Sequence, residues 1–309
     1  MKSLKIGDVK LKNRLFLAPM VEVSDLPYRL ICRKAGAGMA YIEMINTGAI
    51  LHTNPKTQRL MKTSKADKPS GIQITGPSID DFKKVVPYLK DYDIVDINCG
   101  CPSIRTIDNQ SGSYLLKTPD KIGDYIKILK NAGLNVTANI RLGFDNNNVL
   151  EVAKKIEKAG ASAITVHARM ASHSYKIPAD WAWIGKVKKE LGIPVIGNGD
   201  ISNGKHAEQM LDICDGVMIA RAAIGDPFIF DRIKYYLRTG NEKEFDFKAN
   251  IKLFNEYLKL AEKHDMIDLP RIKYVGSNFL RNVSGAGKMR NELMGKRTFD
   301  EIKEFAGTL

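Results

Sequence analysis

The segment DINCGCPSIRTIDNQSGSYLLK, residues 96–117, contains the side chains of this chain that are best suited to chemistry. A predicted strand ends there, because Gly100 permits a tight turn and Pro102 cannot extend a strand ladder. The turn directs Cys101 toward the open end of the strand. Cys99 points to the other side, since side chains alternate along a strand, and is expected to be a small buried packing residue. The pattern predicts that Cys101 is the accessible, reactive thiol.

The cysteines do not follow a disulfide or metal-binding pattern. Cys32, Cys99, Cys101 and Cys214 are too few and too scattered for a disulfide framework in a chain of 309 residues. The Cys-X-Cys pair has no second Cys or His pair at the spacing that zinc sites use. We expect reduced thiols and no metal site.

Two segments, PVIGNGDISNGKHAEQ (194–209) and DGVMIARAAIGDPFIF (215–230), indicate a site for a phosphorylated ligand. In many barrels the loops after the last two strands bind phosphate through backbone N–H groups. Small residues at Gly197, Gly199, Ala220 and Ala222 allow a close approach, and Arg221 supplies a fork of donors. The pattern does not identify the ligand.

A further group of residues suits a flat ring. Pro19 and Met20 follow a predicted strand and offer an apolar shelf, and Gln73 offers an amide at the end of another strand. A flavin ring requires such a shelf together with a few amide-like partners at its pyrimidine edge. His167 ends a further strand, but a single histidine is by itself more often structural.

These residues lie in a chain that alternates short apolar runs with longer amphipathic stretches, a pattern typical of repeated βα units. Helices, several ending at glycine, are predicted between the runs. Eight such units predict an α/β fold of the (β/α)8 TIM-barrel type, with a doubly wound open sheet as the alternative. The predicted strands are residues 15–19, 39–44, 70–76, 94–100, 135–141, 163–169, 194–199 and 216–221.

Polar residues recur at or near the carboxyl ends of these strands. In a barrel those ends share one face, where active sites are built. The sequence therefore predicts that these side chains meet at one mouth together with Cys101. They are Glu43, Gln73, Asn98, Arg141, His167, Asn198 and Arg221.

The barrel pattern stops near residue 240, and the remaining chain predicts helices and no strand. We expect a barrel domain over residues 1–240 and an all-helical domain over residues 244–309. Residues 271–297 hold seven Lys or Arg residues and a single acid, Glu292. A solvated helix surface is the ordinary explanation of a charge run, but the near absence of acids favours a phosphate-binding surface.

The overall composition agrees with a folded soluble protein, with 44% hydrophobic and 27% charged residues. No apolar run approaches the roughly 20 residues of a membrane span, and the first twenty residues do not resemble a cleaved signal. The net charge of +13 favours a polyanionic partner, because cations placed on phosphates release counterions. We expect a cytoplasmic, monomeric protein without a membrane or DNA partner.

From about Leu11 to Arg297 the chain resembles the tRNA-dihydrouridine synthase family. Several of the matching stretches are specific to that family rather than to flavin barrels at large. They are LKNRLFLAPMVEVSDLPYR, AYIEM, GIQITG, DINCGCPS, IRLG, ITVHAR, ADW, PVIGNGDI and MIARAAIGDPFIF.

The resemblance implies FMN as the cofactor. It places Pro19, Met20 and Val21 beside the flavin ring, Gln73 at its edge and His167 nearby. It places a second group around the ribityl phosphate: Asn198, Gly199, Asp200, Ala220 and Arg221.

The resemblance also implies a reaction, the reduction of the 5,6 double bond of a uridine in tRNA, expected in the D-loop. NADPH or NADH reduces the flavin, which passes hydride to C6 while Cys101 gives a proton to C5. General acid help of this kind contributes roughly 10² to 10⁴ in rate. The uridine must leave its stack to reach a barrel mouth.

The expected contacts to the RNA follow from the same resemblance. Asn98 is the candidate to read the uracil edge, and Arg141, Arg169 and Tyr175 are further substrate candidates. The helical tail is expected to hold the tRNA body through Arg271, Lys273, Arg281, Lys288 and Arg290.

The chain departs from the family pattern in two places. Asn139 stands where members usually have Lys, and an amide cannot stabilise an anionic reduced flavin as a charge would. The stretch after ITVHAR differs at Met170, Ala171, His173 and Ile177, whereas Tyr175 and Trp181 match.

Two rival interpretations are an FMN barrel oxidoreductase of a free pyrimidine-like molecule and a catalytically impaired RNA-binding homologue. The sequence specifies neither the modified uridine nor the choice between NADPH and NADH.

Overall fold

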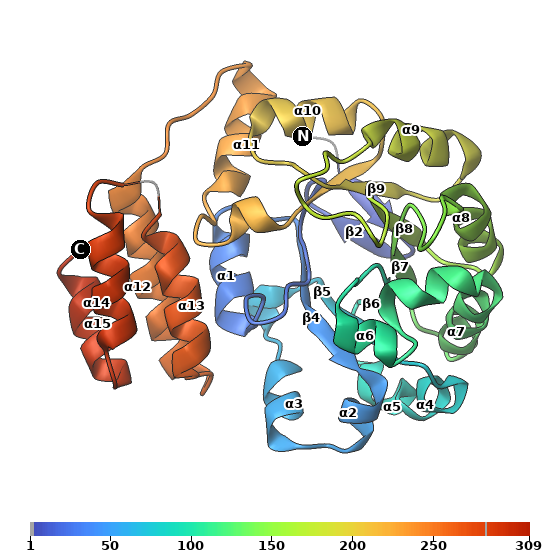
Figure 1. Ribbon diagram of the computed structural model, residues 1–309, viewed down its shortest axis with the longest axis horizontal. Helices are drawn as coiled ribbons and strands as arrows, with labels where there is room; N and C mark the ends of the chain where they lie inside the picture. The colour runs from blue at the N-terminus through green and yellow to red at the C-terminus, as the bar shows by residue number, and fades with distance from the viewer. Residues whose placement is uncertain (1–2, 282) are drawn as a thin grey trace.

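A computed structural model describes residues 3–281 and 283–309 and shows a closed barrel of eight parallel strands with helices around it (Figure 1). Each strand pairs with the next one along the chain, and β10 closes the barrel against β3. The predicted TIM barrel is confirmed, and all eight predicted strands are present. They are β3 (Leu15–Leu17), β4 (Met39–Asn46), β5 (Ser70–Thr75), β6 (Ile94–Cys99), β7 (Val136–Arg141), β8 (Ala163–His167), β9 (Val195–Asn198) and β10 (Gly216–Ile219).

The helices between the strands form the outer layer of the barrel. Many begin at a side-chain cap, as α1 does at Asp25, whose carboxylate accepts from the backbone N–H of Tyr28. The α-helices are α1 (Leu26–Lys34), α2 (Thr47–Leu51), α3 (Pro55–Leu60), α4 (Ile79–Lys84), α5 (Val86–Leu89), α6 (Ile104–Asp108), α7 (Pro119–Asn131), α8 (Val149–Lys158), α9 (Trp181–Glu190), α10 (Gly204–Leu211) and α11 (Ile229–Thr239). Short 3₁₀ helices are η1 (Lys65–Asp67), η2 (Gly112–Lys117) and η3 (Arg221–Ala223).

A two-stranded hairpin at the start of the chain, β1 (Leu4–Ile6) and β2 (Val9–Leu11), was not predicted. Ile6 and Leu11 are fully buried and belong to the same apolar cluster as Phe16 and Met218, whose side chains lie inside the barrel. The hairpin therefore closes the amino-terminal end of the barrel. Any ligand reaches the interior from the opposite end, the barrel mouth, which is formed by the carboxyl ends of the strands.

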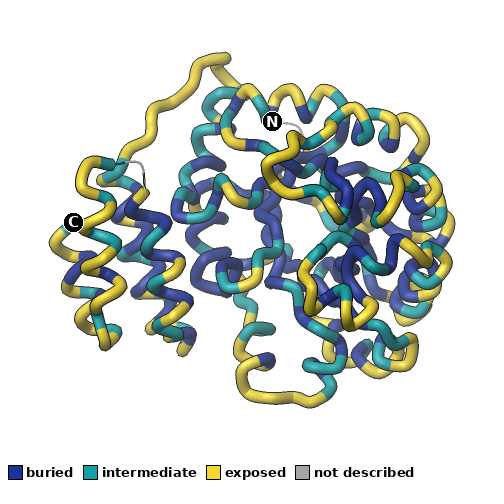
Figure 2. The backbone as a smooth tube through the Cα atoms, viewed as in Figure 1, coloured by how far each residue is buried: buried dark blue, intermediate teal, exposed yellow. Residues whose placement is uncertain are grey.

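Four C-terminal helices pack beside the barrel: α12 (Phe247–Lys263), α13 (Leu269–Phe279), α14 (Ala286–Gly295) and α15 (Phe299–Gly307). Figure 1 shows them in orange and red on one flank of the barrel, with α12 and α13 nearer to it than α14 and α15. The segment 240–246, which connects α11 to α12, is exposed throughout, and it is yellow in Figure 2. The buried sides of α12 and α13 lie between the helices of the barrel and the outer helices α14 and α15.

Aromatic and polar contacts fix these helices to the barrel. The Tyr28 ring of α1 meets the rings of Tyr257 and Phe279 edge-on, at centroid distances of 6.0 and 6.4 Å. Gly225 has a φ of +75°, and a Cβ there would lie 2.2 Å from the carbonyl carbon of Asn278. Only glycine permits this close approach. The C-terminal helices are therefore held against the loops of the barrel mouth.

Within residues 3–281 and 283–309, no helix combines the length and the apolar character that a membrane span requires.

Candidate functional site

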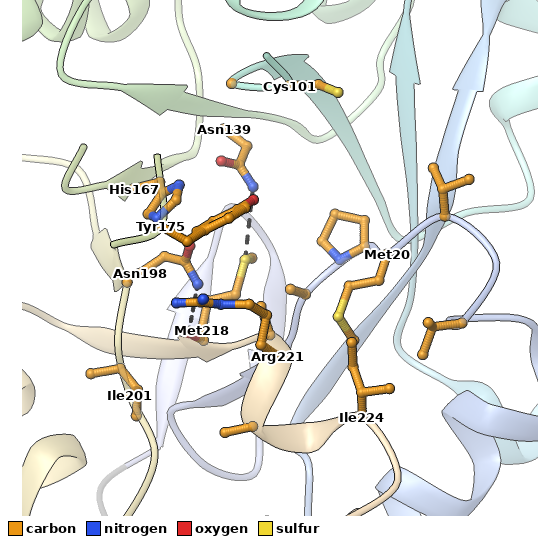
Figure 3. A pocket seen from close by; sticks show the side chains of 18 of the residues that line it. Met20, Cys101, Asn139, His167, Tyr175, Asn198, Ile201, Met218, Arg221 and Ile224 are labelled. Carbon is orange, nitrogen blue, oxygen red and sulfur yellow. Dashed lines mark hydrogen bonds between the residues drawn. The ribbon is translucent and has the colours of Figure 1, made fainter. Parts of the chain in front are cut away.

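A cavity of about 770 Å³ opens at the barrel mouth. Its volume lies in the range of about 300 to 1,000 Å³ that is typical of sites for cofactors and small molecules. In Figure 3, His167, Tyr175 and Asn198 lie on one side of the cavity, and Met20 and Ile224 lie on the other. Cys101 enters from a further side, above Asn139 in the view. The cavity thus combines an apolar wall with a polar one.

The structure brings nearly all of the predicted cofactor and substrate residues together at this cavity. Of the residues predicted to contact a cofactor or substrate, all except Arg169 line it: Pro19, Met20, Val21, Gln73, Asn98, Cys101, Asn139, Arg141, His167, Tyr175, Asn198, Gly199, Asp200, Ala220 and Arg221.

The Cys101 turn is held by hydrogen bonds to its backbone. The N–H groups of Gly100 and Cys101 donate to Oδ1 of Asn98, at 3.1 and 2.9 Å. On the other side, Nε of Arg141 donates to the Gly100 carbonyl at 2.7 Å. The Cys101 carbonyl accepts from the N–H of Ser113 at 3.0 Å. The backbone therefore fixes the turn, and the side chain remains partly exposed to the cavity.

Two hydroxyl groups lie next to the thiol. Oγ of Ser103 and Oγ1 of Thr106 are each 3.6 Å from Sγ of Cys101, and they are 2.6 Å from each other. The other three cysteines are buried. Burial raises the pKa of both Cys99 and Cys214 above the ordinary thiol value. Within the part of the chain that the structure describes, Cys101 is thus the thiol that a ligand in the cavity can reach.

A cluster of charged side chains lies where β8, β9 and β10 end. Asp200 accepts from NH2 of Arg169 at 2.6 and 2.7 Å and from NH2 of Arg221 at 3.0 Å. The pKa of Asp200 is lowered, because these bonds outweigh the effect of its burial. Two guanidinium groups and one carboxylate leave one net positive charge. Arg221, whose side chain is 52% exposed, presents that charge to the cavity.

His167 carries no charge near neutral pH. Its burial and the nearby Arg141 and Arg169 lower its pKa to about 3. NH1 of Arg169 lies 3.2 Å from Nε2 of His167. Since a guanidinium only donates, Nε2 accepts and Nδ1 carries the ring proton. The neutral imidazole is thus available to a ligand as a hydrogen-bonding group rather than as a cation.

Tyr175 lies over the mouth, between several cations. The Arg221 guanidinium lies 4.3 Å from the centre of its ring, and the Arg169 guanidinium lies 5.7 Å from it. Its ring is also roughly parallel to the His167 ring, at 6.2 Å. Tyr175 is 54% exposed, so it offers an open aromatic face at the entrance.

Asn139 projects into the cavity from β7. Its Nδ2 group lies 3.8 Å from the sulfur of Met218 (Figure 3), a weak contact that leaves the amide free to bond a ligand. The position holds no charge, as the sequence indicates.

Three candidates have surroundings that differ from the sequence-based expectation. Arg169 is 1% exposed and is bonded to Asp200, His167 and the carbonyl of Ile177, so it organises the wall and does not face a substrate. Oδ1 of Asn98 accepts from the Cys101 turn, as described above, and its Nδ2 donates to Gln73. Reading a uracil edge is therefore not the main use of the Asn98 side chain.

Arg271 is the third case, and the prediction that it contacts tRNA is wrong. Its side chain is 3% exposed and lies between α13 and the barrel, where NH1 is 2.5 Å from Oε2 of Glu43. A second carboxylate, that of Glu22, lies 3.5 Å away. Glu43, expected near the end of a strand, lies inside β4 and does not line the cavity, because it pairs with Arg271. A guanidinium enclosed in this way cannot reach a phosphate.

The other predicted RNA contacts have more open positions. Arg281 and Lys288 are exposed, and Arg290 and Lys273 are partly exposed. Nζ of Lys273 donates to the Met294 carbonyl at 2.9 Å.

Of the lining residues that sequence reasoning did not place in the cavity, three are described here. Met218 lies two positions before Ala220 on β10, so alternation along the strand predicts that it faces inward with Ala220. His206 lies on the first turn of α10 and bonds Ser202. Tyr274 comes from α13, and no local pattern signals that a helix outside the barrel contributes to the mouth.

Among the described residues, no three His, Cys, Asp or Glu side chains come together in a group that could hold a metal ion.

The fold and the cavity define the class of protein: a (β/α)8 barrel with a ligand site at the carboxyl ends of its strands, flanked by C-terminal helices. The solved structure of an old yellow enzyme homologue from Zymomonas mobilis shares this fold, with a TM-score of 0.53 over 80% of this chain and 95% of that chain at 12% identity. A family model described as dihydrouridine synthase matches residues 16–304. The chain belongs to the dihydrouridine synthase family, as the resemblance predicts.

Curated relatives agree with this assignment. A protein of Pasteurella multocida named tRNA-dihydrouridine synthase B is 38% identical over 74% of this chain and 70% of its own length. A probable tRNA-dihydrouridine synthase of Aquifex aeolicus is 32% identical over 80% of this chain and 82% of its own length.

Proposed function

We propose that this protein is a flavin-dependent tRNA-dihydrouridine synthase, which reduces the 5,6 double bond of a uridine in tRNA, in the D-loop. The names of the relatives and the family assignment support the reaction. The observation that carries the proposal is the position of Cys101, the one accessible thiol of the described residues, at the cavity of a TIM barrel.

The composition of the cavity supports FMN as the cofactor. Pro19, Met20 and Val21 supply an apolar shelf, and Gln73 and Asn139 supply amides. Arg221 supplies the net positive charge that a phosphate requires, in the loop after β10 where many barrels bind phosphate. Bound FMN, after reduction by NADPH or NADH, would supply the hydride for C6 of the uracil.

Cys101 would supply the proton for C5. Its thiol faces the cavity, its backbone is fixed on both sides, and no charged group of the described residues is within hydrogen-bonding distance of Sγ. A donor held in this way protonates a weakly basic carbon without first reorganising the turn. Tyr175 and the neutral His167 would orient the ligands, and the closed lower end of the barrel would limit the access of water.

The basic surface of the C-terminal helices would hold the tRNA. We propose that residues 244–309 form a tRNA-binding domain beside a catalytic domain of residues 1–240. Arg281, Lys288 and Arg290 are the cations that would contact phosphates, with a minor part for Lys273. Tyr274 carries this surface to the rim of the cavity, because it lies on α13 and also lines the mouth.

Mass-spectrometric mapping of dihydrouridine in tRNA tests the function and identifies the modified position. We expect cells that lack the gene to contain uridine at one or a few positions where the parent strain has dihydrouridine. Expression of the gene restores the modification, and expression of its Cys101→Ala variant does not. Identical dihydrouridine maps with and without the gene would refute the proposal.

A further inference from the structure

A chain of hydrogen bonds runs from the barrel interior to the Cys101 turn. Oδ1 of Asp96 accepts from the Thr137 hydroxyl at 2.6 Å, and its Oδ2 accepts from Nε2 of Gln73 at 2.7 Å. Oε1 of Gln73 accepts from Nδ2 of Asn98 at 2.7 Å. Oδ1 of Asn98 then accepts from the backbone N–H groups of Gly100 and Cys101. The chain therefore connects a buried carboxylate to the residue that holds the reactive thiol.

The members of this chain are shielded from water. Asp96 and Gln73 are each 1% exposed, and Asn98 is 8% exposed. Water cannot easily replace a lost partner at such depth, so each broken bond leaves an unsatisfied polar group. Burial raises the pKa of Asp96 to about 6, and the bonds from Thr137 and Gln73 oppose that increase. Near neutral pH Asp96 is therefore mainly a carboxylate.

The chemistry of the two ends determines the orientation of both amides. A carboxylate only accepts, so Gln73 must turn its Nε2 toward Asp96 and its Oε1 toward Asn98. Asn98 must then donate from Nδ2, which leaves Oδ1 for the turn. At the other end, backbone N–H groups only donate, so they require the same orientation. The two ends agree, and from the turn to Asp96 every bond donates toward the carboxylate.

We propose that Asp96 is a positioning residue for Cys101, which fixes the direction of the Gln73 and Asn98 amides and so holds the turn that presents the thiol. This role lies outside the cavity, because Asp96 does not line it. The proposed positioning role rests on the proposed function only in one respect, namely that Cys101 serves as the proton donor. The presentation of the thiol can be measured without tRNA or a nicotinamide.

The test reverses the direction of the chain. In Asn98→Asp, the new carboxylate still accepts from the turn, but Gln73 now lies between two carboxylates and must point its oxygen at one of them. In Asp96→Asn/Asn98→Asp, Asn at position 96 donates to Gln73, which flips and donates to Asp at position 98. The two bonds of Gln73 are then restored in the opposite sense, whereas the Thr137 hydroxyl still donates to an oxygen at position 96 and the turn still donates to position 98.

Two readouts on the flavin-free protein distinguish the variants. Asn98→Asp should lower the melting temperature by roughly 2 to 5 °C and change the alkylation rate of Cys101, compared at its high-pH plateau, by at least about fivefold. The single Asp96→Asn change should move both readouts in the same direction as Asn98→Asp but less far, because an amide can still satisfy Gln73 and Thr137 but no longer fixes the direction of Gln73. The double variant should return close to the values of Asp96→Asn. Thr137→Val serves as the control, since it leaves the bond from Asp96 to Gln73 in place and should not change the alkylation rate.

A double variant as impaired as Asn98→Asp in both readouts would overturn the proposal, because a charge at position 98 would then be harmful by itself. If Asn98→Asp fails to fold, a soluble double variant supports the proposal and an insoluble one contradicts it. Neither readout depends on uridine reduction. The positioning role can thus fail in a protein that reduces tRNA, or hold in one that does not.

Discussion

At the scale of single residues, the thiol of Cys101 owes its position to the backbone rather than to contacts of its own. Its N–H and C=O groups are both bonded, whereas the polar contacts of Sγ within residues 3–281 and 283–309 are two hydroxyl groups at 3.6 Å. Removal of the sulfur therefore leaves the turn intact. The chemical role of the side chain can be separated from its structural role.

Cys101→Ala should lower the rate of uridine reduction by roughly 10² to 10⁴. FMN binding should be unchanged, and the melting temperature should stay within about 2 °C. Single-turnover reduction of unmodified tRNA by the reduced enzyme measures the rate. Cys214→Ala, which removes a buried thiol outside the cavity, serves as the control. A Cys101→Ala variant that turns over at the parental rate would refute the proton-donor role.

His167 should give the folded protein a specific dependence on pH. Its folded pKa of about 3 lies below the ordinary histidine value of 6.5, so the unfolded chain binds more protons between these values. The stabilisation is present above pH 6.5 and is lost as the pH falls toward 3, with each pKa unit worth about 1.4 kcal/mol.

His167→Gln should therefore lose less stability than the parent when the pH is lowered from 7 to 5. Urea unfolding of both flavin-free proteins at several pH values measures the difference. Asp25 and Asp96, whose pKa values burial raises to about 6, act in the opposite direction but are present in both proteins. Equal pH dependence in the two proteins would show that His167 is not held neutral.

The sequence predicts which residues meet at the mouth better than it predicts what each side chain does there. Strand alternation and the carboxyl-end rule bring Cys101, Gln73 and Asn98 together. Neither rule shows that the side-chain oxygen of Asn98 accepts from the Cys101 turn, or that Asp96 is linked to Asn98 through Gln73. Those assignments depend on partners that are distant along the chain, such as Thr137.

At the scale of elements, the loops after β9 and β10 act together, because Asp200 of one loop holds Arg221 of the other. Arg169 of the loop after β8 also pairs with Asp200, so the three groups together carry one net positive charge. The arrangement gives the cavity one available cation at the end where a phosphate is expected.

Arg221→Ala should weaken FMN binding by roughly tenfold or more, because a hydrogen bond to a charged group contributes about 1.5 to 3 kcal/mol. Fluorescence titration of the flavin-free protein with FMN and with riboflavin measures the effect. The loss should be confined to FMN, since riboflavin lacks the phosphate. Arg59→Ala, on α3 and outside this cavity, is the control. An equal loss for both ligands would place the phosphate elsewhere.

The pair formed by Arg271 and Glu43 attaches α13 to β4. Arg271→Met should lower the free energy of unfolding by roughly 3 to 5 kcal/mol, because it leaves a buried carboxylate without its partner. Arg271→Met/Glu43→Met should recover most of that loss. Urea unfolding measures both. If Arg271 contacted phosphate instead, the single variant would keep its stability and weaken tRNA binding in a salt-dependent way.

The elements themselves were predictable where they repeat. Eight apolar runs with helices between them predict the barrel, and the structure confirms it. The hairpin of β1 and β2 was missed because its strands have three residues each, although apolar residues alternate on both sides of Gly7 and Asp8. The predicted strand 163–169 ends at His167, because the chain turns there and the N–H of Arg169 donates to the His167 carbonyl.

At the scale of the whole molecule, the C-terminal helices place a basic surface beside a barrel mouth to which they also contribute Tyr274. The sequence predicts the charge of this surface, but not its attachment. The attachment depends on long-range contacts such as those of Tyr28 with Tyr257 and Phe279. The same attachment buries one cation of the segment 271–297, Arg271, in a pair with Glu43 of the barrel.

Replacement of Arg281, Lys288 and Arg290 by Gln should weaken tRNA binding and reduce its dependence on salt. Each lost phosphate contact lowers the slope of log affinity against log salt by about 0.7 to 0.9. Filter binding between low and moderate salt measures the slope. FMN affinity and the melting temperature should not change. An unaltered slope would place the RNA surface elsewhere on the molecule.

Whether this barrel reduces uridine within tRNA can be measured in one reaction with purified components. Purified protein loaded with FMN is incubated with NADPH and an unmodified tRNA transcript, and the nucleosides are analysed by mass spectrometry. We expect dihydrouridine at defined positions of the transcript, none with the Cys101→Ala variant, and no reduction of free uridine. Reduction of free uridine with unmodified tRNA left intact, or a protein that does not take up FMN, would contradict it.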